Sequence, residues 1–226
     1  MLLSKPAIER FMALGEIIIS PFDPRNLKSA QYDVTLGKHY WRPRRTVGHP
    51  DKVYNPFDET SVRGAWMREH AQPHSTVARI EHWAGLLKGI APEEQIVLLG
   101  PGETILAHTE EFIGSNSHRV TAMMKARSSM GRNFLEVCRC AGMGDHGYFN
   151  RWTLEIQNNS RDFTVPLVAG RRVGQLLFFQ TEPLGQTEND YIADGKYQST
   201  GDLLVLQKSW TPDEMLPKQW LDREVR

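Results

Sequence analysis

The sequence of 226 residues has no excess charge of either sign, because lysine plus arginine and aspartate plus glutamate both number 27. Such a balance provides no net field to attract nucleic acid or a membrane surface. The chain also lacks an apolar run of membrane-spanning length, and a basic-then-apolar signal pattern at its beginning. We therefore expect a soluble, cytoplasmic protein that binds neither nucleic acid nor membrane. A small anionic ligand needs only a local cationic pocket, so neutrality does not argue against a site for one.

Cysteine is scarce, with only Cys138 and Cys140. Residues two apart on a strand point the same way and do not readily form a disulfide with each other, so we interpret both as small buried residues in a reducing compartment. Zinc deaminases carry H-x-E together with P-C-x-x-C, and no C-x-x-C occurs here. The eight histidines show no H-E-x-x-H spacing. We predict no strong protein metal site, and a deaminase of this sequence would have to work without zinc.

Glycine is frequent, yet neither G-x-G-x-x-G nor G-x-x-x-x-G-K-[ST] opens a helix, which argues against Rossmann and P-loop folds. Short strand-like runs separated by polar turns dominate instead. They cover 16–20, 31–37, 96–99, 104–108, 119–125, 135–140, 151–157, 164–168 and 172–180. This spacing predicts a mainly β fold, a barrel or jelly roll with a few peripheral helices, rather than β-α-β units. The length suits one domain, 1–226, with an insertion.

Helices are expected at the margins of this β pattern. Ser4 can cap a first helix that ends at Gly15. Thr211-Pro212-Asp213-Glu214 is a capping box that predicts a short helix in the C-terminal part. We interpret about 190–226 as a lid segment and tail, with a mobile stretch at 191–201.

The segment of about 40–94 differs from its surroundings, because it is rich in arginine, histidine, proline and tryptophan and lacks a strand rhythm. We interpret it as an insertion with an extended loop followed by a helix. That helix should begin at Ser75, with an apolar face of Val77, Ile80, Trp83 and Leu87. Three arginines near its start, Arg42, Arg44 and Arg45, are interpreted as a solvated loop rather than a phosphate site.

Two polar clusters interrupt the strands. Residues 127–132, RSSMGR, combine two guanidinium groups with short hydroxyl and glycine residues, which allow backbone N–H groups to approach a phosphate. Residues 142–148, GMGDHGY, form a glycine-rich hairpin with one carboxylate and one aromatic ring. The strand TLEIQN follows directly.

RSSMGR, AGMGDHGY and TLEIQN, in this order, resemble the dCTP deaminase branch of the trimeric dUTPase-like superfamily. The stretches QYDVTLG, GRRVGQL and GKYQ and the opening 24 residues, MLLSKPAIERFMALGEIIISPFDP, also match that branch. The resemblance covers most of the chain except about 40–94 and the last two dozen residues. It implies a distorted dUTPase-like β-barrel or jelly roll, and a homotrimer whose sites form between subunits. It also implies a nucleotide triphosphate that arrives with Mg²⁺.

Glu155 is the principal catalytic candidate. Strand alternation places Thr153, Glu155 and Gln157 on the face opposite Trp152 and Leu154. The pattern alone favours a solvated outer face, whereas the resemblance makes Glu155 the catalytic glutamate. One carboxylate can activate water and then protonate departing ammonia if burial and a cationic neighbour hold its pKa in range.

The resemblance assigns further catalytic roles to three residues. Arg132 matches the arginine that pairs with the glutamate, and Ser128 matches a serine that stabilises the tetrahedral centre. The carbonyl of Ala141 matches an acceptor near the nucleophilic water.

Substrate-binding roles follow from the same resemblance. Asp145 would contact the deoxyribose 3′-hydroxyl, and in related dUTPases the equivalent aspartate activates the attacking water. Tyr148 would contact the sugar and base. The alternatives are a turn-forming aspartate and a ring that only packs the hairpin. Arg127 and Ser129 would bind phosphate oxygens, and the alternative is an ordinary β-turn. Gln175 matches a nucleotide-binding glutamine. Lys196, Tyr197 and Gln198 match a segment that closes over the triphosphate, and Tyr191 precedes it.

The sequence also departs from the family. Gly144 replaces a usual isoleucine, which should loosen the hairpin, and Cys138 and Arg139 replace residues that some members use in feedback inhibition by dTTP. The expected function is deamination of dCTP to dUTP and ammonia. The alternatives are a dUTP diphosphatase, a bifunctional enzyme that forms dUMP and pyrophosphate, and a catalytically silent nucleotide-binding regulator.

Overall fold

Three antiparallel sheets form the body of the protein, for which a computed structural model describes residues 1–44, 53–80, 83, 85–139, 142–185, 191 and 195–225. The six-stranded sheet has the order β4 (Trp66–His70), β3 (His39–Pro43), β7 (Thr104–Ser115), β11 (Phe149–Asn158) and β9 (Leu135–Glu136), with β1 (Ile17–Ser20) paired to β7. The four-stranded sheet has the order β10 (Met143–Gly144), β8 (Val120–Ala126), β13 (Arg172–Gln180) and β2 (Tyr32–Thr35). The smallest sheet has the order β12 (Val165–Val168), β6 (Gln95–Leu99) and β5 (Gln72–Pro73).

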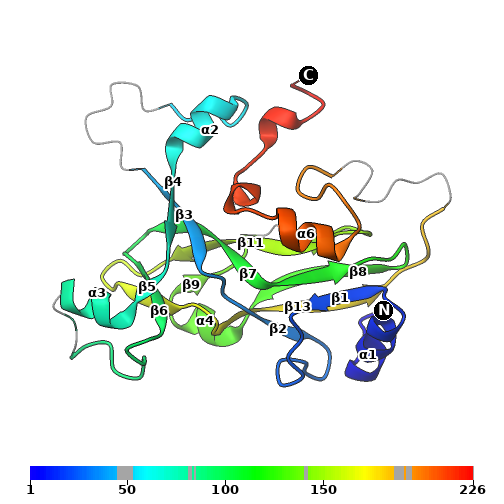
Figure 1. Ribbon diagram of the computed structural model, residues 1–226, viewed down its shortest axis with the longest axis horizontal. Coiled ribbons are helices and arrows are strands. Elements are labelled where there is room, and N and C mark those ends of the chain that lie inside the picture. Colours follow the sequence, from blue (N-terminus) through cyan, green and yellow to red (C-terminus); the bar gives the residue numbers. More distant parts are fainter. Residues whose placement is uncertain are drawn as a thin grey trace.

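The mainly β class is therefore confirmed (Figure 1). The described strands form open sheets rather than one closed barrel. The strand expected at 135–140 is described only at Leu135–Glu136, whereas the run at 104–108 extends to Ser115 in β7.

Strand β11 carries the alternation on which the site depends. Trp152, Leu154 and Ile156 are buried in the main apolar core, while Thr153 and Glu155 on the opposite face are only half-buried. The strand pairs along its length with β7, and the register shifts between positions 151 and 153. One face of β11 thus stabilises the fold, and the other face is available for a site.

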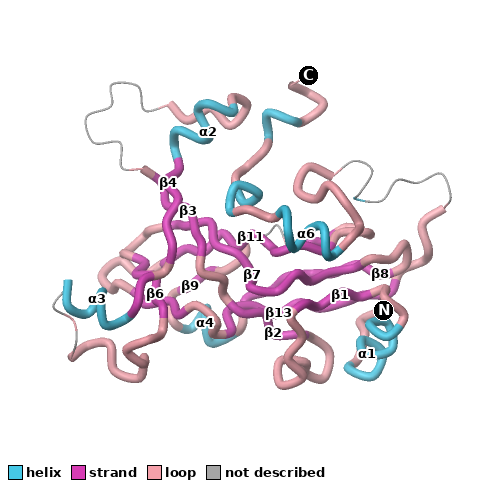
Figure 2. Tube along the Cα trace, in the orientation of Figure 1, coloured by secondary structure: helices cyan, strands magenta, loops and turns pink. Residues whose placement is uncertain are grey.

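The helices are short and peripheral, as Figure 2 shows. They are α1 (Lys5–Ala13), α2 (Glu59–Ala65), α3 (His74–Ile80), α4 (Ser128–Arg132) and α6 (Leu203–Ser209), with 3-10 turns η1 (Pro212–Met215) and η2 (Gln219–Leu221). The first helix is confirmed, although the Ser4 side chain makes no capping hydrogen bond. The capping box forms a single 3-10 turn, and helix α6 was not predicted. No helix among the described residues is long and apolar enough to cross a membrane.

The described part of the segment of about 40–94 is more ordered than its composition indicates. Instead of an extended loop it contributes α2 and the strand β4, which pairs with β3. The expected helix is described as α3, and Val77, Trp83 and Leu87 of its expected apolar face pack in one cluster. Ile80, the fourth residue of that face, is exposed. Arg42 is part of β3 and not a solvated loop residue, because Glu69 and Glu103 form ion pairs with it. Arg44 is exposed, and Arg45 lies outside the described residues.

The C-terminal segment lies across the six-stranded sheet, above β11 in the view of Figure 1. Helix α6 begins at the N-cap Asp202, whose carboxylate accepts hydrogen bonds from two backbone N–H groups. Leu206 of this helix packs against Phe112 of β7 and Phe149 of β11. Burial of this apolar contact holds the chain over the sheet, and it brings residues far apart in sequence together around one cavity.

Candidate functional site

A cavity of about 370 Å³ lies between β11, residues 143–148 and the C-terminal segment. This volume falls within the usual range for small-molecule sites. Its walls are formed by Leu106, Met143, Gly144, Asp145, Tyr148, Asn150, Arg151, Trp152, Thr153, Glu155, Tyr191, Tyr197, Glu214, Met215 and Pro217. Five of the predicted site residues, Asp145, Tyr148, Glu155, Tyr191 and Tyr197, are therefore brought together. The hairpin expected at 142–148 is not formed, because β10 pairs with β8, whereas β11 pairs with β7 and β9.

Glu155 is held in the wall by the pairing of β11 with β7, in which it lies opposite Leu106. Its Oε2 atom is buried and has no hydrogen-bond partner. Burial raises the pKa of this carboxyl above its ordinary value, while backbone N–H groups and the Arg139 charge partly offset the rise. A carboxyl group of this kind can gain and release a proton closer to neutral pH than an exposed one.

The cavity wall formed by residues 143–148 depends on close contact between Gly144 and Trp152. A Cβ atom at position 144 would lie 2.5 Å from Cη2 of the indole ring, so a side chain has no room there. The carbonyl of Gly144 accepts a hydrogen bond from the Thr121 hydroxyl, and β10 pairs with β8 beside it. The glycine is thus explained by the packing of Trp152 rather than by a need for a loose hairpin.

Asp145 and Tyr148 are placed by the turn that follows β10. The Tyr148 N–H donates to the Asp145 carbonyl at 3.1 Å, and Gly147 has φ +82° in the left-handed region that favours glycine. The Tyr148 ring packs edge-on against Trp152 and Tyr191, with centroid separations of 5.3 and 4.8 Å. Burial raises the pKa of the Tyr148 phenol, so the hydroxyl stays protonated.

The segment around Tyr191 and 195–198 closes one side of the cavity. Gly195 is required because a Cβ atom there would lie 2.2 Å from the Tyr191 ring. The Tyr191 hydroxyl accepts a hydrogen bond from the Tyr197 N–H at 3.2 Å, and burial raises the pKa of Tyr191 to about 12. Asn150 of β11 donates from Nδ2 to the Tyr197 carbonyl at 2.8 Å. These contacts fix both tyrosines against β11.

Lys196 and Gln198 lie beside the cavity but contact protein groups. The buried Gln198 side chain accepts from the Phe149 N–H at 2.8 Å and donates to the Gly147 carbonyl at 2.9 Å. It therefore joins residues 195–198 to the turn at 145–148. The Lys196 ammonium forms an ion pair with Asp222.

The other predicted residues lie elsewhere in the chain. Ser128, Ser129 and Arg132 are exposed on α4 and do not line the cavity, and the described structure contains no ion pair between Arg132 and Glu155. Gln175 is on β13, opposite Asp33. Ala141 lies outside the described residues. The pairing that the resemblance implies is therefore not formed within one chain.

Arg127 lines a separate pocket of about 630 Å³. Its Nε lies 3.7 Å from the buried Asp33 carboxylate, which also accepts from Arg172 at 2.9 Å. This pocket is rich in cations, with Arg25, Lys28 and Arg171 also in its walls.

Sequence reasoning missed several residues of the cavity. Arg151 could have been found, because it lies two positions before Thr153 and four before Glu155 on one face of the strand. Its Nη2 donates to Glu110 at 3.2 Å, and burial lowers the pKa of its guanidinium. No local signal marks Glu214, Met215 and Pro217, because only the path of the C-terminal segment brings them to the cavity.

The cavity combines carboxylates with aromatic rings. Asp145, Glu155 and Glu214 supply acceptors, and Tyr148 and Trp152 supply apolar surface. Arg151 is the single Lys or Arg among its described lining residues, and it is paired with Glu110. Such a site suits a neutral polar ring with hydrogen-bond donors, and its described lining residues offer no free cation to a polyanion. Among the described residues, no group of three or more His, Cys, Asp or Glu side chains could hold a metal ion.

Comparison with known proteins agrees with the motifs. A family model described as dCTP deaminase-like matches residues 2–181. A dUMP-forming dCTP deaminase of Methanosphaerula palustris is 31% identical over 186 residues, covering 81% of this chain and 83% of the relative. The enzyme of the same name from Tropheryma whipplei (strain Twist) is 30% identical over 199 residues and 88% of both chains.

A solved structure supports the fold. The 2′-deoxycytidine 5′-triphosphate deaminase of Agrobacterium tumefaciens superposes with a TM-score of 0.53 at 17% identity. The match covers 78% of this chain and 48% of that chain, so this protein spans about half of its length. By its sequence and its fold, this chain belongs to the dCTP deaminase-like family of enzymes.

Proposed function

We propose that this protein hydrolytically deaminates dCTP, and that Glu155 is the base and acid of the reaction. The observation that carries the proposal is the buried, unpaired Oε2 of Glu155 in the wall of a cavity of about 370 Å³. Family membership supports the substrate class, because the relatives described above are dCTP deaminases.

In the proposed reaction, the oxygen of a water molecule bonds to C4 of cytosine while Glu155 takes one of the water protons. Glu155 passes this proton to N3 of the ring, then takes the remaining proton from the C4 hydroxyl and delivers it to the amino group. The C4–N bond breaks, and the amino group leaves as ammonia. The C4 oxygen becomes the carbonyl of uracil. General acid–base catalysis of this kind contributes about 10²- to 10⁴-fold to a rate.

A second copy of the chain is proposed to complete the site. The nucleoside part of the substrate fits the carboxylate-rich cavity, whereas the triphosphate requires cations that the described lining residues do not offer. Arg127 and the exposed α4 residues Ser128, Ser129 and Arg132 can supply them from a neighbouring subunit. A homotrimer with sites between subunits would bring both halves together, with Gln175 near the phosphates.

Mg²⁺ is proposed to arrive with the nucleotide, held by phosphates and water. The lack of a carboxylate or histidine cluster among the described residues fits an ion that the protein itself does not cage. When bound, the ion would neutralise phosphate charge. We infer that no zinc takes part, because the sequence lacks the C-x-x-C of the zinc deaminases.

A second candidate function is deamination followed by cleavage to dUMP and pyrophosphate. The names of the two relatives, both dUMP-forming, favour it, as does Asp145 in the cavity wall. A carboxylate there could activate a second water for attack on the phosphate chain.

One assay separates these possibilities. The purified protein is incubated with dCTP, and separately with dUTP, in Mg²⁺, and the nucleotides, ammonia and pyrophosphate are measured. Ammonia with accumulating dUTP indicates a deaminase, and ammonia with dUMP and pyrophosphate indicates the bifunctional enzyme. Cleavage of dUTP without ammonia release from dCTP indicates a diphosphatase. No product from either nucleotide would contradict both candidate functions and favour a silent binder.

A further inference from the structure

Described residues of the segment of about 40–94 form an arm at the β4 edge of the six-stranded sheet. We call β3, α2 and β4 together the insertion arm. Five residue pairs, from His39 opposite His70 to Pro43 opposite Trp66, join its two strands. Helix α2 is capped by Asp58, whose carboxylate accepts from the N–H groups of Thr60 and Ser61. Figure 1 shows the arm reaching the same side of the molecule as the C-terminal turns.

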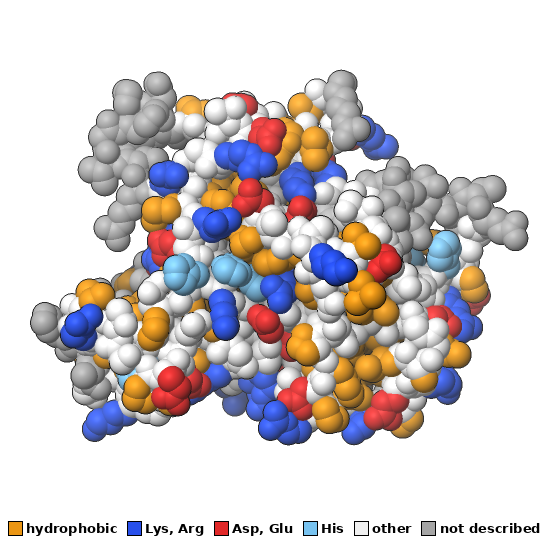
Figure 3. Space-filling view, viewed as in Figure 1, with side chains coloured by type: hydrophobic (Ala, Val, Ile, Leu, Met, Phe, Trp, Pro, Cys, Tyr) orange, Lys and Arg blue, Asp and Glu red, His pale blue; other side chains and the backbone are white. Residues whose placement is uncertain are grey.

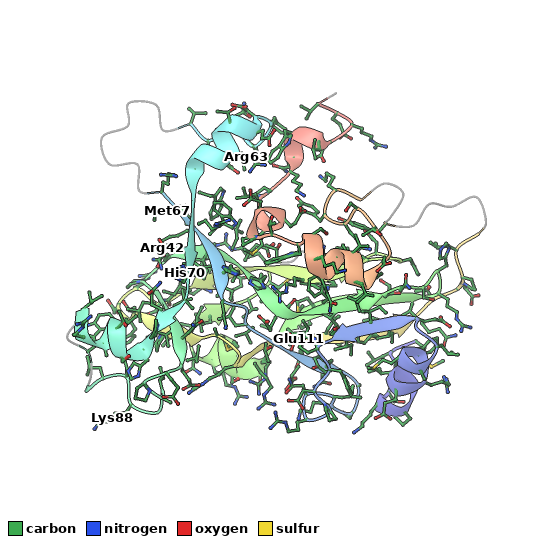
Figure 4. All side chains as sticks on the ribbon, in the orientation of Figure 1. Arg42, Arg63, Met67, His70, Lys88 and Glu111 are labelled. Atoms are coloured by element: carbon green, nitrogen blue, oxygen red, sulfur yellow. The ribbon has the colours of Figure 1, made fainter. Side chains whose placement is uncertain are left out.

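This arm contacts residues 211–218, which we call the C-terminal wall. The indole Nε1 of Trp41 donates to the Pro212 carbonyl at 2.7 Å. The Asp213 carboxylate lies 3.3 Å from Nη1 of Arg63 and 3.9 Å from Nη1 of Arg68. Arg63 projects from the arm toward the C-terminal turns in Figure 4, and Figure 3 shows basic and acidic side chains interspersed over this region.

The opposite side of the C-terminal wall faces the cavity. Glu214, Met215 and Pro217 are lining residues, and Met215 is almost fully buried. Lys218 joins this wall to the neighbouring segment, because its Nζ contacts Glu214 at 2.7 Å and the Lys196 carbonyl at 3.1 Å. Asp213 and Glu214 are adjacent in sequence, yet one contacts the arm and the other the cavity.

We propose that Arg63 and Arg68 of the insertion are positioning residues for nucleotide binding, acting through Asp213. Two guanidinium groups on the insertion arm hold one carboxylate, and this fixes the next residues, Glu214 and Met215, in the wall of the cavity. The insertion thereby sets the shape of the site without contacting the substrate. This inference rests on the proposed function, since it assigns a role in the binding of that nucleotide.

The ion pairs are exposed, so each contributes modestly and is weakened by salt. Reversing the charge of Asp213 replaces two attractions by two repulsions and should displace the wall. Because the wall lines the binding cavity and does not include Glu155, the effect should fall on KM rather than on kcat. We expect Asp213→Lys to raise KM for dCTP roughly 3- to 10-fold, as the combined effect of exposed pairs, with kcat little changed.

The decisive variant restores the attraction with the charges exchanged. The triple variant Asp213→Lys, Arg63→Glu, Arg68→Glu should recover most of the wild-type KM. Glu59→Gln is the matched control, because it removes the helical partner of Arg63 without touching Asp213, and it should leave KM unchanged. Wild-type KM in Asp213→Lys, or no recovery in the triple variant, would overturn the proposal.

Hydrogen exchange separates this proposal from the proposed function. The N–H groups of Glu214, Leu216 and Lys218 donate within the described structure, to Thr211, Asp213 and Tyr197. They should exchange faster in Asp213→Lys, and slow again in the triple variant, while β7 and β11 are unaffected. If the wild type does not deaminate dCTP, the proposed function fails, and this exchange pattern together with nucleotide affinity still decides the role of the arm. Unchanged exchange in Asp213→Lys would contradict it.

Discussion

Gly144 and Trp152 lie in direct contact, so that a Cβ atom at position 144 would be 2.5 Å from the indole Cη2. The indole is fixed on its other side, because its Nε1 donates to the Ile113 carbonyl at 2.7 Å. The contact between Gly144 and Trp152 sets the distance between the turn that carries Asp145 and the strand that carries Glu155. The width of the cavity therefore depends on the absence of a side chain at position 144.

Gly144→Ala should destabilise the protein by about 1–3 kcal/mol, because the added methyl group must displace the indole or the β10 backbone. Chemical denaturation of the variant measures this difference. Gly64→Ala on α2 is the control: nothing lies within 4 Å of a Cβ atom there, and alanine is favoured over glycine in a helix. An unchanged free energy of unfolding in Gly144→Ala would contradict this packing.

Glu155→Gln should abolish deamination, with a loss on the order of 10²- to 10⁴-fold, because the amide cannot accept and return a proton. The two side chains have similar shape, so nucleotide affinity measured by calorimetry should change little. Ammonia release at saturating dCTP reports the activity. Substantial turnover by this variant would remove Glu155 from the proposed role.

The raised pKa of Glu155 also predicts a pH-dependent stability difference between the two proteins. The folded chain retains the Glu155 proton at pH values where the unfolded chain has released it. As the pH rises above the ordinary value of about 4.3 and through the raised value, this group therefore reduces stability. Glu155→Gln removes that penalty.

We accordingly expect the variant to have a higher Tm than wild type at pH 7, with a gap that narrows as the pH falls below about 4. Thermal unfolding across this range tests the sign. A lower Tm of the variant at neutral pH would mean that the ionised carboxylate is stabilised in the folded state. In activity assays of the wild type, kcat/KM should fall as acidic pH protonates the base.

A site shared between copies predicts recovery of activity from two inactive proteins. Arg132→Ala should lose about 2–4 kcal/mol of transition-state stabilisation if it acts on the site of a neighbouring subunit. Co-expression with Glu155→Gln would create mixed oligomers in which one interface combines an intact Glu155 with an intact Arg132. Such mixtures should deaminate dCTP faster than either variant alone.

The control for this experiment is a chain with both substitutions, mixed with Glu155→Gln, in which no interface has an intact Glu155. It should remain inactive. If the first mixture also stays inactive although mixed oligomers form, both groups must act within one chain, which contradicts a shared site.

The sequence alone determined the β class and one face of the central strand. Alternation along 151–157 places Glu155 opposite Trp152 and Leu154, and the structure confirms that division. The same alternation could have added Arg151 to the candidates. The two faces can be read from the sequence because side-chain direction in a strand is a local property of the backbone that repeats every two residues.

Only the tertiary structure decided which segments meet around that face. Thr211 to Glu214 predicts a helical turn, yet nothing local indicates that Glu214 and Met215 would line the cavity or that Asp213 would contact Arg63. The segment of about 40–94 shows the same limit, because its composition predicts a solvated Arg42, whereas the structure pairs this residue with Glu69 in a strand. Local patterns specify direction and periodicity, whereas long-range neighbours depend on the packing free energy of the whole chain, which no single segment contains.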